Sequence, residues 1–370
     1  MTLQPVLPDY GGGNVRGLIP ALLGPEAWAR DLPSWMPEEV RHADQAVLLL
    51  LDGLGWDQFR ENAALLPALD SMSSTSITTV APTTTATALT SISTGLTPGE
   101  HGIVGYRVAF GTEIVKMLRW SSARGDRRHA LVPRDVQAFT PFLGHPVPVV
   151  SQAELEHTAF SEAHLRGSRP VGYRAPSSIA PLVRAELAAG ERFVYAYYGG
   201  IDKIAHERGF GEFYDAEIAA ADRLVADLLA AVPAGTVLLV TADHGQVEVG
   251  RNIVRHSDDL LRMVALQSGE GRFRWLHARP GAEKDLIDAA VDEHGDTAWI
   301  VTRQQLLDEA WFGAAVSAPV MSRLGDVALV AREPVSFHDP ADTGPFPLVC
   351  RHGSLTSAEV NVPLCSYLRN

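Results

Sequence analysis

The sequence predicts an α/β protein built on a doubly wound, mostly parallel central sheet. Three short apolar runs have the length and composition of buried parallel strands, and helical patterns precede two of them. Strands that alternate with helices favour a parallel sheet with helices on both faces. Each run is followed within a few residues by a carboxylate. Because such sheets bind ligands beyond the carboxyl ends of their strands, we expect a functional site there.

The first run spans residues 46–51 and leads into Asp52, within the segment LLLLDGLGWD. An Asp after a strand is common in turns, so this pattern alone is ordinary. Gly53 and Gly55, however, would let the backbone approach a metal ion or a phosphate closely. Asp52 is therefore the first candidate site residue.

The second run, residues 193–198, follows a helical pattern at 181–189 and leads to Asp202 and His206. The i, i+4 spacing places both side chains on one face of a helical turn, as chelation of one metal ion requires. Taken alone, such a pair more often marks a solvated helix face.

The third run, residues 237–241, follows a strong helical pattern at 216–231 and ends at Asp243 and His244. Adjacent Asp and His in a glycine-containing loop at a strand end indicate a metal site with moderate specificity. His352, in the segment RHGSLT, would by itself be interpreted as a surface histidine.

A threonine-rich segment, VAPTTTATALTSIST, has the pattern of a loop that enters a helix. Helix capping would explain one threonine, but four of the residues 83–87 are threonine. A hydroxyl at a helix N-terminus is well placed as a nucleophile, because the backbone N–H groups there can hold phosphate oxygens.

Two segments fit the sheet pattern less well. Residues from about 107 to 175 are rich in Arg, Pro and Gly, and we interpret them as a long excursion on the carboxyl side of the strands. Residues 253–345 are expected to form an inserted α+β cap, which leaves 1–252 and 346–370 as the core. The cap has a strand–helix–strand–helix pattern at 273–278, 284–291, 298–301 and 304–310.

Composition limits the classes of function. The formal net charge is −13, so binding to nucleic-acid polymers is not expected, although bound cations could still create a local phosphate site. The two cysteines, Cys350 and Cys365, cannot build a disulfide framework or a Cys-based zinc site. We expect no membrane span and, without a signal-peptide pattern, a cytoplasmic location.

The ordered set Asp…Thr…Asp-x-x-x-His…Asp-His…His resembles the alkaline phosphatase superfamily, and within it the type I phosphodiesterase/nucleotide pyrophosphatase family. The resemblance covers residues 46–356 and is specific as an ordered set. It implies an alkaline phosphatase-like fold. The shared segments are LLLLDGLGWD, the Thr-rich stretch leading to STGLTPGEHGI, YGGIDKIAH, TADHGQ and HGSLT.

The resemblance also implies a role for each candidate residue. Thr85 matches the nucleophile in the register set by STGLTPGEHGI, with Thr84 and Thr83 as alternatives. The implied ligands of one metal ion are Asp202, His206 and His352, and those of the other are Asp52, Asp243 and His244 together with Thr85.

Three Asp and three His side chains form two N/O-rich sites, which suit Zn²⁺ first and Mn²⁺ as the alternative. Two divalent ions about 4 Å apart can hold an in-line phosphoryl displacement. The expected reaction passes through a phospho-threonine that water then releases. The implied function is a two-metal hydrolase of phosphate esters, foremost a phosphodiesterase or nucleotide pyrophosphatase with a small phosphate ester or nucleotide as substrate.

Two departures from the family pattern concern the substrate. Tyr106 stands near the position where eukaryotic-type members carry an Asn that helps bind the phosphate, and residues 86–88 replace the Phe-Pro-Asn that follows the nucleophile. Tyr106 and Arg107 are weaker candidates for substrate contacts.

Three alternative functions stay open. A phosphomonoesterase or a phosphonoacetate hydrolase could use the same site, and a catalytically inactive metal- or ligand-binding protein is the alternative of another class. The leaving group and the oligomeric state are not determined by these patterns.

Overall fold

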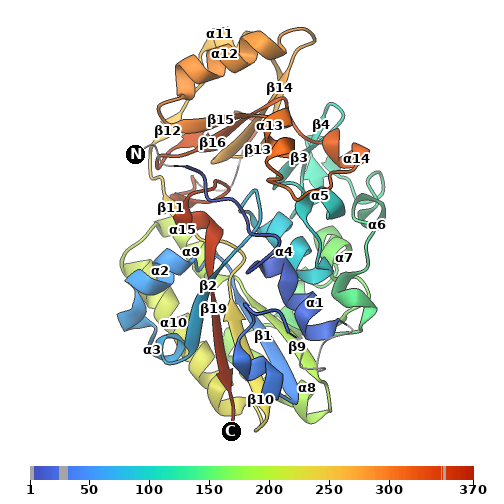
Figure 1. Cartoon of the computed structure of the whole chain (residues 1–370), viewed down its shortest axis with the longest axis vertical. Coiled ribbons are helices and arrows are strands. Elements are labelled where there is room, and N and C mark those ends of the chain that lie inside the picture. Colours follow the sequence, from blue (N-terminus) through green and yellow to red (C-terminus); the bar gives the residue numbers. More distant parts are fainter. Residues whose placement is uncertain (1–3, 25–31, 343, 345–346) are drawn as a thin grey trace.

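The structure is a computed structural model that describes residues 4–24, 32–342, 344 and 347–370. Its largest sheet has seven strands in the order β2-β19-β10-β1-β9-β7-β8 (Figure 1). Within this sheet β19 runs antiparallel to both of its neighbours and the other pairs are parallel, which confirms the predicted mostly parallel sheet. The strands are β1 (Gln45–Leu51), β2 (Ser73–Thr78), β7 (Pro148–Gln152), β8 (Arg169–Tyr173), β9 (Phe193–Tyr198), β10 (Thr236–Thr241) and β19 (Asn361–Leu368).

The three strands predicted from apolar runs are neighbours at the centre of the sheet. β1 lies between β10 and β9, and nearly every residue of the three is buried. Burial of both faces explains why these strands are continuously apolar instead of alternating. Leu50 pairs with Thr241, and Leu51 pairs with Tyr198. The carboxyl ends of the three strands therefore meet at one edge.

Helices cover both faces of the sheet, as a doubly wound fold requires (Figure 1). The predicted helices at 181–189 and 216–231 correspond to α8 (Ile179–Ala188) and α10 (Glu212–Ala231). One group of helices comprises α2 (Trp56–Glu61), α3 (Pro67–Asp70), α9 (Gly200–Arg208) and α10, and another comprises α1 (Leu18–Leu23), α4 (Thr85–Thr94) and α7 (Ala159–Leu165).

The expected excursion at 107–175 is wrong for its second half. Its first half does leave the central sheet and forms a small antiparallel sheet from β3 (Arg107–Phe110), β4 (Glu113–Lys116), β5 (Ser121–Ser122) and β6 (Gly125–Asp126). β7 and β8, however, extend the central sheet. The sequence analysis missed β8 because it is a half-exposed edge strand that contains Pro170 and Gly172, and both residues weaken the pattern of a strand.

The predicted cap region contains a four-stranded antiparallel sheet in the order β13-β14-β16-β15, at the top of Figure 1. Leu276 and Leu286 belong to a small core of its own, whereas Phe273 and Trp275 join the main core. The division of the chain into core and cap stays a prediction. The elements are α11 (Asp258–Met263), β13 (Val264–Glu270), β14 (Phe273–Ala278), α12 (Glu283–His294), β15 (Ala298–Thr302), α13 (Arg303–Asp308), α14 (Ala318–Met321) and β16 (Val327–Ala331).

Two short strand pairs lie outside these sheets. β11–β18 joins the segment after β10 to the segment before His352, and β12–β17 joins two segments of the cap region. Among the residues that the structure describes, no helix is both long and apolar enough to cross a bilayer. The remaining α-helices and strands are α5 (Pro98–His101), α6 (Pro133–Val136), β11 (Val247–Glu248), β12 (Ile253–Val254), β17 (Ser336–Phe337), β18 (Cys350–Arg351) and α15 (Ser357–Val360).

Candidate metal centre

The three predicted aspartates lie together at the carboxyl edge of the central sheet. Asp52 follows β1, Asp202 lies in the first turn of α9 just after β9, and Asp243 follows β10. Because β10, β1 and β9 are adjacent, their ends carry these carboxylates to one place.

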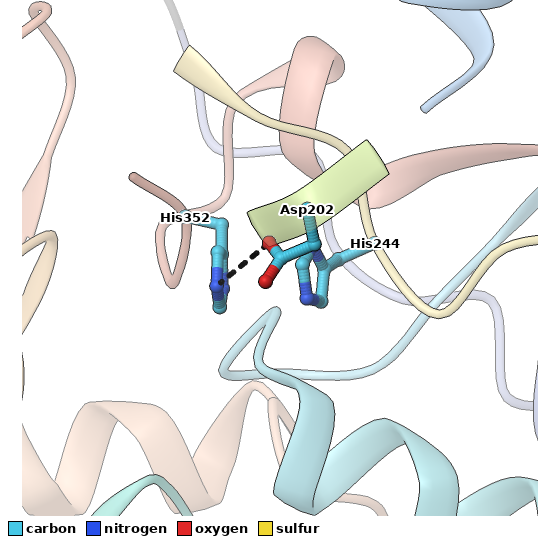
Figure 2. A group of neighbouring side chains, drawn as sticks. All are labelled: Asp202, His244 and His352. Carbon is cyan, nitrogen blue, oxygen red and sulfur yellow. Dashed lines mark ion pairs between the residues drawn. The ribbon is translucent and has the colours of Figure 1, made fainter. Parts of the chain in front are cut away.

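Two groups of possible ligand atoms form there, each with all its atoms within 4.8 Å of one another. One group is Asp52, Asp243 and His244, and the other is Asp202, His244 and His352. Figure 2 shows the side chains of the second group, which come from three different segments and point toward one another. His206 stands at the margin of this group, with its Nε2 3.3 Å from Asp202 Oδ1. The structure thus brings the six predicted Asp and His ligands together, with His244 shared between the groups.

The three histidines all present the same nitrogen to the site. Nδ1 of His206 lies 2.7 Å from the Cys350 carbonyl oxygen, Nδ1 of His352 lies 2.7 Å from that of Thr83, and Nδ1 of His244 lies 3.1 Å from that of Gly245. A carbonyl only accepts hydrogen bonds, so each Nδ1 carries the proton. Each Nε2 is therefore left with a lone pair, as in histidines that bind metals.

Asp52 and Asp243 each have one hydrogen-bonded carboxylate oxygen and one free one. Asp243 Oδ1 accepts the backbone N–H groups of Gly53 and His244, both at 3.1 Å, and Asp52 Oδ2 accepts the hydroxyl of Tyr197. Asp52 Oδ1, Asp202 Oδ1 and Asp243 Oδ2 are buried and have no hydrogen-bond partner among the described residues. Unpartnered buried carboxylate oxygens are costly unless a cation binds them. This donor set therefore fits two divalent metal ions.

The electrostatics of the cluster lead to the same conclusion. Burial, reinforced by the charges of Asp243 and Asp202, raises the pKa of Asp52 well above its usual value. Burial also raises the pKa of Asp243, and burial with the neighbouring His244 and His206 lowers the pKa of His352. Positive charge placed among these groups would stabilise the ionised carboxylates and the neutral imidazoles together.

Thr85 lies beside this cluster at the start of α4. Thr84 is the extended N-cap residue, so Thr85 is the first residue of the helix. Its Oγ1 is 3.1 Å from His244 Nε2. The hydroxyl of Thr83 is engaged elsewhere, because it donates to the Ser354 carbonyl and accepts from the Gly353 N–H. Of the predicted nucleophile Thr85 and its alternative Thr83, only Thr85 presents its hydroxyl to the ligand groups.

Two cavities meet at Thr85. One, of about 240 Å³, runs between α4, α7 and the ends of the strands. The other, of about 720 Å³, opens toward the cap. Thr85, Leu118, Asp202 and Lys203 line both. The smaller cavity has a mainly apolar wall that includes Leu89, Val149, Leu155, Phe160, Tyr195 and Tyr197, whereas the larger has a charged one that includes Arg119, Glu270, Asp342 and Arg351.

Of the two weaker candidates, the structure brings one to the site and not the other. Tyr106 lines the larger cavity, and its backbone N–H donates to Glu270 Oε2 at 3.1 Å. Arg107 is buried and forms an ion pair with Asp339, away from both cavities that meet at Thr85. A substrate contact by Arg107 is therefore not supported by its position.

Several residues at the site were not singled out from the sequence. Tyr197 supports Asp52, and Lys203, Arg119 and Glu270 line the larger cavity. The alternation of side chains along a strand could have indicated two of the cavity residues. Tyr195 and Tyr197 share a face of β9, and both line the smaller cavity. Glu270 lies at the end of β13, for which no pattern was recognised, so its position depends on the cap fold.

The fold and the grouped Asp and His side chains are those expected of the alkaline phosphatase superfamily, and the family comparison supports a hydrolase of this class. The model for the type I phosphodiesterase/nucleotide pyrophosphatase family matches residues 46–179 and 180–355, and the chain belongs to this family. Members of this family bind two divalent metal ions, and membership supports a phosphoric ester hydrolase. A sequence comparison with curated proteins gives no match.

Solved structures of two kinds of enzyme resemble the chain. Murine ectonucleotide pyrophosphatase/phosphodiesterase 5 superposes with a TM-score of 0.64 at 14% identity, over 87% of each chain. Phosphonoacetate hydrolase from Sinorhizobium meliloti 1021, solved with phosphonoformate, gives 0.64 at 17% identity, over 89% of this chain and 91% of the hydrolase. An inactive form of the murine protein was solved with AMP. At these identities the likeness is one of fold.

Proposed function

We propose that the protein is a two-metal phosphodiesterase or nucleotide pyrophosphatase that acts through a phospho-threonine on Thr85. The observation that carries this proposal is the position of the Thr85 hydroxyl. It lies at the N-terminus of α4, 3.1 Å from His244 Nε2, and His244 belongs to both groups of ligand atoms.

In this reaction the Thr85 oxygen forms a bond to phosphorus while the bond from phosphorus to the leaving oxygen breaks. Water then breaks the bond between phosphorus and Thr85 Oγ1, so the net reaction is hydrolysis. The first N–H groups of α4 have no partners within the helix and carry the positive end of its dipole. They are placed to hold the non-bridging oxygens of the phosphoryl group.

Two divalent ions, when bound, would supply the positive charge that lowers the pKa of the Thr85 hydroxyl and neutralises the leaving oxygen. The chain would hold them with the Nε2 atoms of three histidines and one free oxygen from each of three aspartates. A mixed nitrogen and oxygen set of this kind suits Zn²⁺ best, and Mn²⁺ next.

The two cavities that meet at Thr85 favour a diester over a monoester. A phosphodiester carries two substituents, and the site offers a separate space for each on either side of the nucleophile. A monoester would fill one of them. AMP, bound by the murine relative, is a product that a nucleotide pyrophosphatase would release, and this supports the nucleotide class.

A second candidate, a phosphonate hydrolase, is favoured by the charges of the larger cavity. Arg119, Lys203 and Arg351 line its wall and could pair with a carboxylate next to the phosphonate. The similar fold of a hydrolase solved with phosphonoacetate adds to this possibility.

The test compares three substrates on the zinc-loaded protein, with a chelated sample as control: bis-p-nitrophenyl phosphate, p-nitrophenyl phosphate and phosphonoacetate. We expect faster, chelator-sensitive cleavage of the diester. Preference for the monoester or the phosphonate would replace the diesterase proposal with the matching alternative. No cleavage of any substrate, with zinc bound, would favour the catalytically inactive binding protein. The cytoplasmic location stays a prediction.

A further inference from the structure

A second cluster of imidazole and carboxylate groups lies in the cap, where α11 meets α12 at the top of Figure 1. His256 precedes Ser257, the N-cap residue of α11, and Glu293 and His294 are the last two residues of α12. One ligand atom from each of His256, Glu293 and His294 lies within 4.8 Å of the other two. None of the three residues belongs to the candidate metal centre.

The distances within this cluster match those of a small metal site. His256 Nδ1 lies 2.9 Å from His294 Nε2, which lies 3.2 Å from Glu293 Oε1. In a tetrahedral zinc site with metal–nitrogen bonds of about 2.0–2.1 Å, ligand atoms are about 3.3 Å apart. Both distances from His294 Nε2 are therefore within a few tenths of an ångström of that spacing, and the whole set lies within 4.8 Å.

The three side chains are also held in place from outside the cluster. The carboxylate of Glu293 accepts the Ser257 N–H at 2.8 Å and the Ser257 hydroxyl at 2.6 Å. The ring of Phe337 packs against both imidazoles, at 6.1 Å from His256 and 5.3 Å from His294. Such support fixes the orientation of ligands before an ion binds.

The protonation of the cluster is compatible with a metal ion. Burial lowers the pKa of His256 to about 4, and burial lowers the pKa of His294 as well, so both rings are neutral at pH 7. His294 Nε2 faces a carboxylate oxygen and a second imidazole nitrogen. A single proton on Nε2 can bridge these three atoms, and a divalent cation can take its place.

We propose that His256, Glu293 and His294 form an additional metal site, which binds a divalent transition-metal ion such as Zn²⁺ and ties α11 to α12. His294 is buried whereas Glu293 reaches the surface, so water can occupy a fourth position. His256 and His294 are 38 residues apart, so the ion would close a long loop of the cap and stabilise it. The site is structural and independent of hydrolysis.

The test is equilibrium dialysis of the whole chain against Zn²⁺, comparing wild type with His256→Asn and Glu293→Gln. We expect each variant to bind one equivalent of zinc fewer than wild type, or to bind that equivalent at least about 100-fold more weakly, since even outer partners of a metal ligand change affinity 10- to 100-fold. Asp292→Asn, an exposed neighbour on α12, is the matched control and should bind as wild type does.

The result is the difference in bound zinc between wild type and each variant, so it does not depend on how many ions the candidate metal centre holds. Diester hydrolysis should be equal in all four proteins. Equal zinc binding by wild type and Glu293→Gln, with matching circular dichroism and melting temperature in chelator, would overturn the proposal. Glu293→Gln decides the outcome if His256→Asn does not fold, because the Glu293 side chain is partly exposed.

Discussion

The position of Thr85 depends on the roles of the two threonines before it. The hydroxyl of Thr83 forms hydrogen bonds to the loop that carries His352, and Thr84 has the extended backbone of the residue that precedes α4. Thr85 is the threonine whose hydroxyl lies 3.1 Å from the ligand atom His244 Nε2. The three threonines, which seemed redundant in the sequence, therefore have three different local roles.

Replacing Thr85 with Ala should abolish turnover of the preferred substrate and leave zinc binding largely intact. The loss should be at least about 1000-fold, because removal of a covalent nucleophile leaves only the background from binding and charge stabilisation. Burst kinetics and zinc content would be measured on the same preparation.

Thr84→Ala is the control for the effect of the substitution on the helix start. It should retain most activity, since the Thr84 side chain makes no capping hydrogen bond. Substantial activity in Thr85→Ala would transfer the nucleophile to another hydroxyl or to water.

The three aspartates could be placed from the sequence because each follows a strand that the sequence predicts, whereas His352 was assigned only through the family resemblance. Asp52, Asp202 and Asp243 follow buried strands whose apolar runs were recognised. Their supporting residues were not, because a hydrogen bond such as that from Tyr197 to Asp52 depends on strand order, which a single sequence does not encode locally.

At the scale of elements, the central strands β1, β9 and β10 were predicted to within a residue. The edge strands β2 and β8 were missed, and so were the buried strands β16 and β19. β8 and β2 have mostly exposed or half-exposed residues, so their pattern resembles that of loops. β13 was missed although β14 beside it was predicted in full. The pattern of apolar residues in a strand depends on which segments pack against its two faces, and those segments come from distant parts of the chain.

One link between the cap sheet and the core is a buried ion pair. Arg272, in the turn between β13 and β14, holds both oxygens of Glu359 in α15 at 2.8 Å, and neither side chain is exposed. Glu359 also accepts from the Ser354 N–H and the Thr356 hydroxyl. One carboxylate therefore joins the cap, the loop after His352 and the start of β19.

Arg272→Ala should lower the free energy of unfolding by about 3–5 kcal/mol, because it leaves a buried carboxylate without its partner. Urea denaturation would measure this loss. Arg303→Ala is the control, since its pair with Asp326 is partly exposed and should contribute at most about 1 kcal/mol. A similarly small loss for Arg272→Ala would mean that the pair does not couple the two parts.

At the scale of the whole molecule, the contribution of Glu270 to stability without metal should fall as the pH rises. Burial raises the pKa of Glu270 to about 8, against 4.5 for an ordinary glutamate. Its protonated form is favoured by folding, so its contribution is complete below about pH 4.5 and is lost as the pH rises through about 8.

Melting temperatures in chelator between pH 5 and 8 would check this dependence. Glu270→Gln keeps the shape of the side chain but cannot ionise, so the melting temperature of wild type should fall relative to that of the variant as the pH rises over this range. Parallel curves for the two proteins would show that Glu270 titrates normally.

The position of β19 has a consequence for how the protein is made. Residues 361–368 leave the ribosome after all the other strands of the central sheet, yet they fill the place between β2 and β10. Until then both of those strands have an open edge, which is a template for aggregation. His352, in the loop before α15, also emerges late. A nascent chain that stalls before residue 361 would thus contain an incomplete central sheet and would be expected to bind chaperones.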